Sequence, residues 1–175
     1  AAAAGAPARV LESRIRPPTD AREKIDERWG EIGLASATVV GLNPGAGFES
    51  KRWPEERWLA LGRALIAGGL SVAVFAGPEE RGLGERLASE IGGGAVGLER
   101  LSLGELAAAF ERCRIVVSND TGPSHISAAV GTPTLVLMAG NDGPSQFAVR
   151  GDRHTLIYGE SILAISIDDV RTAIG

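Results

Sequence analysis

The segment from Ser118 to His125, Ser-Asn-Asp-Thr-Gly-Pro-Ser-His, has the composition of a helix start that could bind an anion. Pro123 suits the first turn of a helix, so Gly122 is the expected N-cap. The amides of Ser124 and His125 would then be among those without an intrahelical partner. Because a helix N-terminus also carries partial positive charge, such amides can hold a phosphate. The segment therefore predicts an anion site where a short helix begins.

The polar residues around this helix start leave more than one role open. Asp120 would repel a phosphate, so its carboxylate could instead orient backbone amides, pair with a neighbouring cation or meet sugar hydroxyls. Asp120 and Thr121 could equally do no more than cap the helix. A neutral His125 could donate a hydrogen bond to phosphate or sugar, although a lone histidine is more often structural. Local chemistry does not choose between the roles of Asp120 and Thr121, and it favours a structural role for His125.

A second loop, at 43–53, follows an apolar run and combines glycines with two cations. Gly45 and Gly47 let the backbone approach a ligand closely. Lys51 and Arg52 add positive charge just before a predicted helix, which is what a diphosphate needs. The alternative is a plain glycine turn with a solvated lysine and arginine. The loop is not a P-loop, because the sequence Gly-Lys-Ser/Thr is absent.

A third loop, Gly-Pro-Glu-Glu at 77–80, offers carboxylates to a ribose. Glu79 or Glu80 could accept paired hydrogen bonds from ribose hydroxyls, as acidic residues do in dinucleotide-binding folds. The alternative is that both are ordinary acidic residues of a first helical turn, and the local sequence favours that alternative.

The elements that must position these loops alternate between strand and helix. Short apolar runs predict strands at 38–42, 70–76, 95–98, 114–118, 134–138 and 155–158. Helical spacing predicts helices at 20–31, 54–67, 83–91, 102–110, 123–130 and from Asp168, with Ser102 and Glu105 at capping-box spacing. This alternation predicts an α/β fold, a Rossmann-like three-layer domain with a mainly parallel sheet. Ligands bind beyond the carboxyl ends of such strands, so all three loops are expected at one sheet edge.

The bulk composition is that of a soluble globular domain with its own core: 175 residues, of which 44% are apolar. The net charge of −4 and pI near 5.3 argue against a nucleic-acid-binding surface. Two histidines and one cysteine, widely spaced, predict neither a zinc site nor an internal disulfide. Asn119-Asp120 with Asp142 is too little for a magnesium site, so we expect no metal and no cofactor. Cys113 is expected to be a packed thiol.

The domain organisation follows from the ends of this pattern. Residues 1–18 begin Ala-rich and close on Pro17-Pro18, which predicts a linker or inter-domain arm before a domain at 19–175. Thr19 and Asp20 are the predicted N-cap residues of the first helix. His154 is expected in a surface loop. No apolar stretch is long enough to span a membrane. The first residues include neither an initiator methionine nor the charged start of a signal peptide, so we expect a fragment of a longer protein.

Taken together, the loops resemble the C-terminal domain of the ADP-heptose:lipopolysaccharide heptosyltransferases. The resemblance spans about residue 17 to the end and rests on motifs in the same order as in that family. They are Asn43-Pro44-Gly45-Ala46, Lys51-Arg52-Trp53-Pro54, Gly77-Pro78-Glu79-Glu80, Asn119-Asp120-Thr121-Gly122-Pro123-Ser124-His125 and Ala128-Ala129-Val130-Gly131-Thr132-Pro133.

The resemblance implies a glycosyltransferase-B architecture, two Rossmann-like domains of which this chain is the C-terminal half. Lys51 then matches the lysine that holds the donor diphosphate, and Glu79 or Glu80 the acidic contact to the ribose. Ala46 and Gly47 stand where some members place hydroxyl side chains, so here only backbone amides could make that contact. The segment that closes around the diphosphate and sugar is matched by Asp120, Thr121, Gly122 and His125.

The implied reaction transfers heptose from ADP-heptose to a lipopolysaccharide core, with inversion and without an essential metal. The catalytic base would be an Asp of an N-terminal acceptor domain absent from this chain, so we expect donor binding without transfer. The implied location is cytoplasmic, at the inner face of the cytoplasmic membrane with at most peripheral contact. The alternatives are a transferase or epimerase that uses another nucleotide sugar, and a stand-alone nucleotide-sugar-binding module. The chain reads Asn-Asp-Gly-Pro at 141–144, where the family often has Pro-Thr-Asp, so the sugar stays open.

Overall fold

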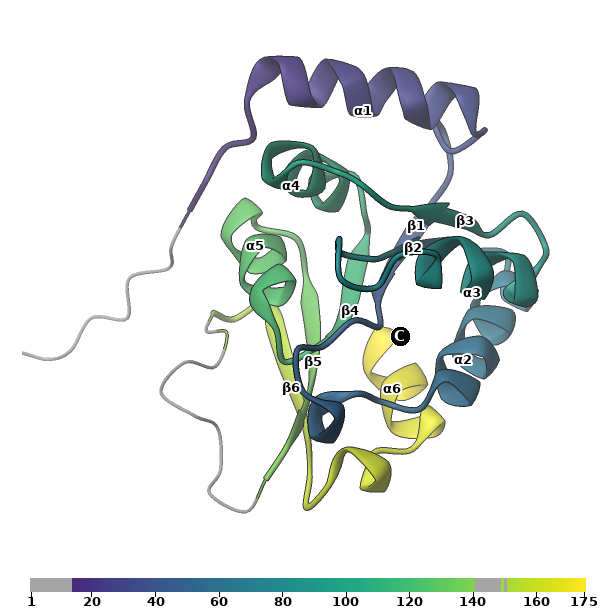
Figure 1. The fold of residues 1–175 in the computed structure, drawn as a ribbon, viewed down its shortest axis with the longest axis vertical. Helices are drawn as coiled ribbons and strands as arrows, with labels where there is room; N and C mark the ends of the chain where they lie inside the picture. Colours follow the sequence, from purple (N-terminus) through teal and green to yellow (C-terminus); the bar gives the residue numbers. More distant parts are fainter. Residues whose placement is uncertain (1–13, 141–148, 150) are drawn as a thin grey trace, which may run out of the picture.

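The protein is built around a six-stranded sheet in which all strand pairings among the described residues are parallel. The computed structural model describes residues 14–140, 149 and 151–175. The strands are β1 (Val39–Asn43), β2 (Ser71–Phe75), β3 (Val96–Leu98), β4 (Ile115–Asn119), β5 (Thr134–Ala139) and β6 (His154–Gly159). Their order across the sheet is β3-β2-β1-β4-β5-β6, which is the Rossmann order (Figure 1).

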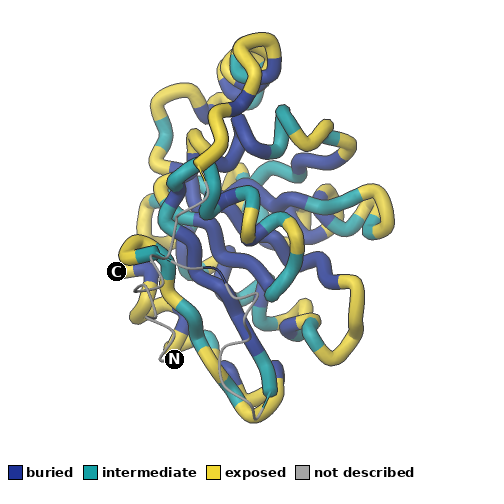
Figure 2. The backbone as a smooth tube through the Cα atoms, turned by 90° about the vertical axis from the view of Figure 1, so that its left-hand side faces the viewer, coloured by how far each residue is buried: buried dark blue, intermediate teal, exposed yellow. Residues whose placement is uncertain are grey.

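Helices cover both faces of the sheet (Figure 1). They are α1 (Thr19–Glu31), α2 (Glu55–Ala67), α3 (Leu83–Ile91), α4 (Leu103–Glu111), α5 (Gly122–Val130) and α6 (Ile167–Ile174), with short 3-10 helices η1 (Glu49–Lys51) and η2 (Ile162–Ala164). One core cluster joins the sheet to α2, α3 and α6. The other joins it to α4, to α1 and to the inner side of α5. The four central strands β2, β1, β4 and β5 are mostly buried between these two layers, whereas the edge strand β6 is intermediate to exposed (Figure 2).

The predicted α/β fold is confirmed. Each predicted end of a strand or helix lies within one residue of the end in the structure. The reason is the nearly continuous apolar character of the strands, which a sheet covered on both faces requires. All five residues of β1 are buried, and so are the first five of β5. The predicted capping box is also present: the Ser102 hydroxyl accepts from the Glu105 amide at 3.2 Å, and the Glu105 carboxylate accepts from the Ser102 amide at 2.8 Å.

Two local predictions away from the candidate site are wrong. Thr19 and Asp20 do not cap α1, because Pro18 takes the N-cap position and both residues lie inside the first turn. The fixed φ of a proline suits this extended entry into the helix. His154 is not a surface-loop residue but the first residue of β6, paired with Thr134. The predicted arm at 1–18 lies outside the described residues except for 14–18, and so does the segment 141–144.

Cys113 is a packed thiol, as predicted. It is buried against the second core cluster, and its Sγ lies 3.4 Å from the carbonyl oxygen of Ala109. Burial raises the pKa of this thiol to about 12, because the thiolate would lose its hydration. Within the described residues, none of the helices is both long and apolar enough to cross a membrane.

A buried carboxylate at the end of β3 binds the backbone amides at the start of α3. Glu99 follows β3 directly and is only 7% exposed. Its two oxygens accept hydrogen bonds from the amides at the start of α3, from Gly82 at 2.9 Å, Gly84 at 2.8 Å and Glu85 at 3.2 Å. Burial alone would raise the pKa of Glu99, but these three amides, helped by Arg100, bring it below its usual value. A side chain distant in sequence thus caps α3.

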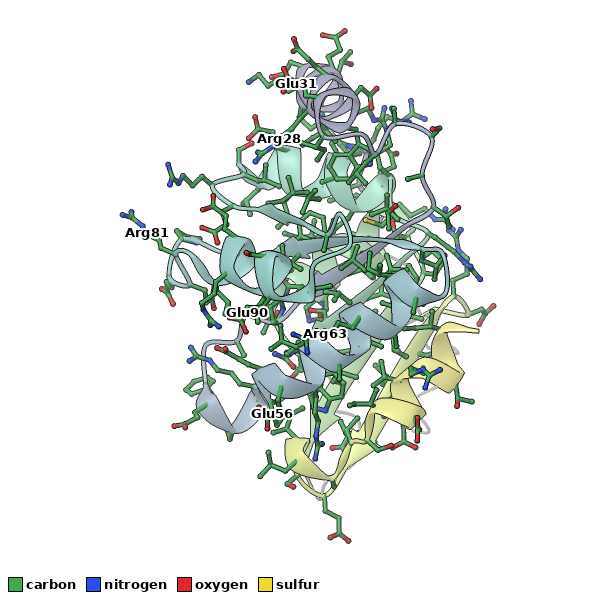
Figure 3. All side chains as sticks on the ribbon, turned by 90° about the vertical axis from the view of Figure 1, so that its right-hand side faces the viewer. Arg28, Glu31, Glu56, Arg63, Arg81 and Glu90 are labelled. Carbon is green, nitrogen blue, oxygen red and sulfur yellow. The ribbon has the colours of Figure 1, made fainter. Side chains whose placement is uncertain are left out.

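We expect Glu99→Gln to lower the free energy of unfolding by about 1–3 kcal/mol at pH 7, because an amide cannot accept from all three N–H groups. A carboxyl whose pKa is lowered by folding stabilises above its unfolded value, about 4.3, and loses that contribution as the pH falls. Denaturant unfolding at pH 7 and pH 3 should therefore show the difference between wild type and variant shrinking in acid. Glu56→Gln, at an exposed position of α2 (Figure 3), is the control. A difference that stays constant with pH would contradict this account.

Candidate functional site

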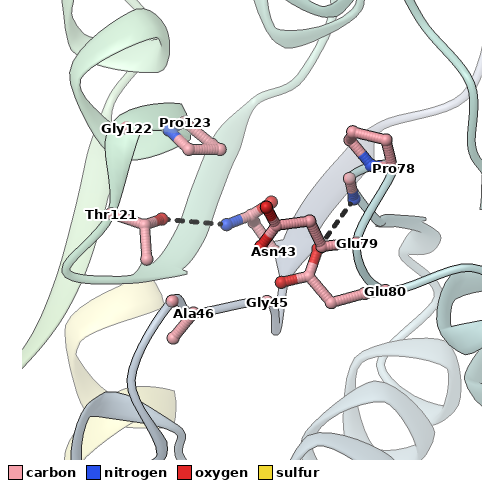
Figure 4. Close-up of a pocket in the computed structure, with 11 residues that line it drawn as sticks. Asn43, Gly45, Ala46, Pro78, Glu79, Glu80, Thr121, Gly122 and Pro123 are labelled. Carbon is pink, nitrogen blue, oxygen red and sulfur yellow. Dashed lines mark hydrogen bonds between the residues drawn. The ribbon is translucent and has the colours of Figure 1, made fainter.

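The candidate site lies where the chain reverses its direction of winding across the sheet. β1 and β4 are neighbours, and the helices that follow them, α2 and α5, pack into different core clusters. Ligands of open α/β sheets bind at such a switch point, beyond the carboxyl ends of the strands. A pocket of about 350 Å³ occupies this position (Figure 4). It is lined by Asn43, Gly45, Ala46, Gly47, Gly77, Pro78, Glu79, Glu80, Thr121, Gly122 and Pro123.

The structure therefore brings the three predicted loops together around one pocket. Six of the predicted site residues line it: Ala46, Gly47, Glu79, Glu80, Thr121 and Gly122. The other three, Lys51, Asp120 and His125, do not. Lys51 and Asp120 lie in the same loops as lining residues, whereas His125 is exposed on α5. The described residues contain no group of three or more side chains that could hold a metal ion.

Two asparagines that sequence reasoning did not assign to the site hold the loops in place. Asn43 ends β1, is 4% exposed, and its side-chain amide donates to the hydroxyls of Ser118 at 3.0 Å and Thr121 at 3.4 Å. The second of these bonds crosses the pocket wall (Figure 4). Because the strand register places Asn43 opposite Ser118, the side chain reaches β4 directly. Asn43 thus joins the end of β1 to the loop after β4.

Asn119 makes the reciprocal connection from the end of β4. Its side chain is fully buried; Nδ2 donates to the carbonyl of Pro44 at 2.7 Å, and Oδ1 accepts from the amide of Trp53 at 3.2 Å. One side chain therefore fixes both ends of the loop at 43–53. A polar residue at the carboxyl end of each of two buried apolar strands was the signal that could have identified both asparagines.

The Glu80 carboxylate lies between two glycines of different loops. The amide of Gly77 donates to its Oε2 at 3.2 Å. A Cβ at Gly45 would stand 2.7 Å from its Oε1, so glycine at this position lets the carboxylate reach the first loop. Glu79 is exposed and lines the same pocket. Both acids thus line the pocket, and the predicted ribose contact of Glu79 or Glu80 stays a prediction.

Lys51 and Asp120 form an ion pair beside the pocket. The Nζ of Lys51 lies 2.6 Å from Oδ2 of Asp120, with the lysine side chain 43% and the aspartate side chain 19% exposed. Of the roles left open for Asp120, pairing with a neighbouring cation is the one observed. Arg52, the other cation of this loop, donates through Nε to the carbonyl of Ala46 at 2.9 Å and so closes the glycine turn.

The predicted start of α5 is wrong by one residue. Thr121 is the N-cap, and Gly122 is the first residue of the helix. The extended backbone of Thr121 turns its carbonyl toward Ser124, whose amide donates to it at 3.1 Å and whose hydroxyl donates at 2.7 Å. Pro123 has no N–H to offer. The amide of Ser124, which was predicted to be free for an anion, is therefore paired within the helix start.

The chain is similar in sequence to known proteins. The sequence profile of a family described as glycosyltransferase family 9 (heptosyltransferase) matches residues 2–160. A lipooligosaccharide heptosyltransferase 2 from Haemophilus influenzae is 33% identical over 130 residues, which cover 71% of this chain and 37% of that protein. The chain thus spans about two fifths of the length of the curated relatives it matches.

Solved structures share the fold. A glycosyl transferase family 9 structure from Veillonella parvula aligns with a TM-score of 0.84 at 22% identity, over 91% of this chain and 52% of that chain. The heptosyltransferase WaaC from Escherichia coli, solved with ADP-2-deoxy-2-fluoro heptose, aligns with a TM-score of 0.69 at 25% identity. That alignment covers 79% of this chain and 42% of that chain.

The buried amide of Asn119 can be tested by truncation. We expect Asn119→Ala to lower the free energy of unfolding by about 2–4 kcal/mol, because it leaves the Pro44 carbonyl and the Trp53 amide without a partner and opens a small cavity. Asn119→Asp keeps the acceptor for Trp53 but sets a carboxylate oxygen against the Pro44 carbonyl, so it should destabilise as well. Urea unfolding of both variants measures this. A loss below about 0.5 kcal/mol for Asn119→Ala would show that Asn119 does not fix the loop at 43–53.

Proposed function

The chain belongs to glycosyltransferase family 9, and we propose that it forms the donor-binding domain of a heptosyltransferase. In this proposal the whole enzyme transfers heptose from ADP-heptose to a lipopolysaccharide core with inversion. The observation that carries it is the single pocket wall built from the loops after β1, β2 and β4, which combine glycine backbone, carboxylates and a nearby lysine. The names of the relatives support the choice of sugar and acceptor class.

The arrangement suggests where each part of the donor lies. We place the ribose near Glu79 and Glu80, whose carboxylates can accept from its hydroxyls. The diphosphate then lies toward Ala46, Gly47, Thr121 and Gly122, where backbone can approach it and Lys51 stands beside it. When the acceptor hydroxyl attacks the anomeric carbon, ADP departs with the electron pair of the broken bond. Positive charge at Lys51 stabilises that leaving group.

The base that takes the proton from the acceptor hydroxyl is assigned here to another domain of the whole protein. This assignment is supported by the relatives, because this chain spans only about two fifths of their length. The acceptor site would lie in the same domain, so we expect the chain by itself to bind donor without transferring sugar. A cytoplasmic location with at most peripheral membrane contact stays a prediction.

Nucleotide specificity tests the donor assignment. By titration calorimetry of the chain we expect ADP to bind more tightly than UDP, GDP or CMP, and a chelator to leave ADP binding unchanged. Tightest binding of UDP or GDP would indicate a relative that uses another nucleotide sugar. A marked loss with chelator would indicate a metal that the proposal omits.

Lys51→Ala tests the phosphate assignment. We expect it to weaken ADP binding about tenfold or more, since a charge-assisted contact to the diphosphate is lost, while adenosine binding changes little. Lys24→Ala is the matched control, because Lys24 lies on α1 and pairs with Glu105 of α4. Equal losses for ADP and adenosine would remove Lys51 from the phosphate site.

A further inference from the structure

Three polar connections join the loop after β1 to the loop after β4, and they differ in kind. The side chains of Asn43 and Asn119 are buried and neutral, and each satisfies its partners inside the protein. The third connection, Lys51 with Asp120, is charged and partly exposed. Breaking either neutral connection would strand buried polar groups. The ion pair can open into water at little cost, so it is the connection able to change when a ligand arrives.

Lys51 is the cation that a diphosphate would need in this site, and it is paired with Asp120 in the structure. The 2.6 Å contact uses one of the three N–H donors of the Lys51 ammonium and offsets its charge, so a phosphate oxygen would compete with the carboxylate for this cation. Arg52 does not line this pocket, and its Nε donates to the carbonyl of Ala46. A bound diphosphate would also lie near the negative charge of Asp120, whose neighbour Thr121 lines the pocket. Asp120 therefore opposes the diphosphate twice, by competition and by repulsion.

We propose that Asp120 is a positioning residue that holds Lys51 in the empty site and releases it to the donor diphosphate. This inference rests on the proposed function, because it needs Lys51 to be the phosphate cation. Exchange rather than rearrangement is expected, since the asparagines keep both loops fixed while the long lysine side chain swings. The ion pair thereby lowers the affinity of the site for free phosphates, which must displace Asp120 without help. A nucleotide is also anchored by the rest of the pocket.

The test uses the opposite effects that Asp120→Asn should have on stability and on affinity. Loss of the ion pair should lower the melting temperature of the unliganded chain slightly. Affinity for ADP should rise about fivefold, and pyrophosphate should gain at least as much, because competition and repulsion both disappear. Adenosine affinity should not change. Calorimetry with these three ligands and a thermal melt give all four values.

The matched control is Asp26→Asn, which removes an aspartate paired with Arg112 on the side of the molecule covered by α1 and α4. It should change the melting temperature without changing ADP affinity. Asp120→Glu, which keeps the charge, should not reproduce the gain in ADP affinity.

The possible outcomes separate this inference from the function on which it rests. Weaker or unchanged ADP binding by Asp120→Asn would overturn the inference, because it would make Asp120 a direct ligand or a purely structural partner. Failure of the unaltered chain to bind any nucleoside diphosphate would instead overturn the proposed function.

Discussion

The side-chain amide of Asn119 is the interaction on which the rest of the site depends. It sits at the end of β4 without contact to water and holds the first and last parts of the loop after β1, through Pro44 and Trp53. Trp53 is anchored in turn, because its indole N–H donates to the carbonyl of Ile165 at 2.9 Å, and its own carbonyl accepts from Trp58. The loop is therefore anchored to the protein interior at both of its ends.

The anchored loop backbone determines where the charged groups of the site lie. Glu80 can reach the first loop because Gly45 leaves room for its carboxylate, and Lys51 meets Asp120 because η1 projects it toward the loop after β4. Carboxylates thus lie in the wall of the pocket, at Glu79 and Glu80, and beside it, at Asp120. The carboxylates near the second loop suit ribose hydroxyls, while Asp120 is offset by the one lysine close to it. In the proposed arrangement, the carboxylates of Glu79 and Glu80 bind the ribose hydroxyls and Lys51 binds the diphosphate.

Much of this arrangement could be predicted from the sequence, because it depends on local patterns. Apolar runs gave the strands, Ser102 and Glu105 gave the cap of α4, and glycine-rich loops after strands identified the sheet edge. The rest depends on tertiary position. The pairing of Lys51 with Asp120 joins residues 69 apart in sequence, and the Asn119 clamp depends on strand register. The N-cap at Thr121, one residue before the predicted Gly122, depends on backbone angles that residue types do not determine.

A crystal structure of the chain with ADP would test the central claim most directly. The account predicts the nucleotide in the pocket at the ends of β1 and β4, with its ribose beside Glu79 or Glu80 and a phosphate oxygen within hydrogen-bonding distance of Lys51 Nζ. The loop backbone at 43–53 should superimpose on the unliganded form. ADP bound elsewhere on the molecule, or bound here with its phosphates directed away from Lys51, would contradict it.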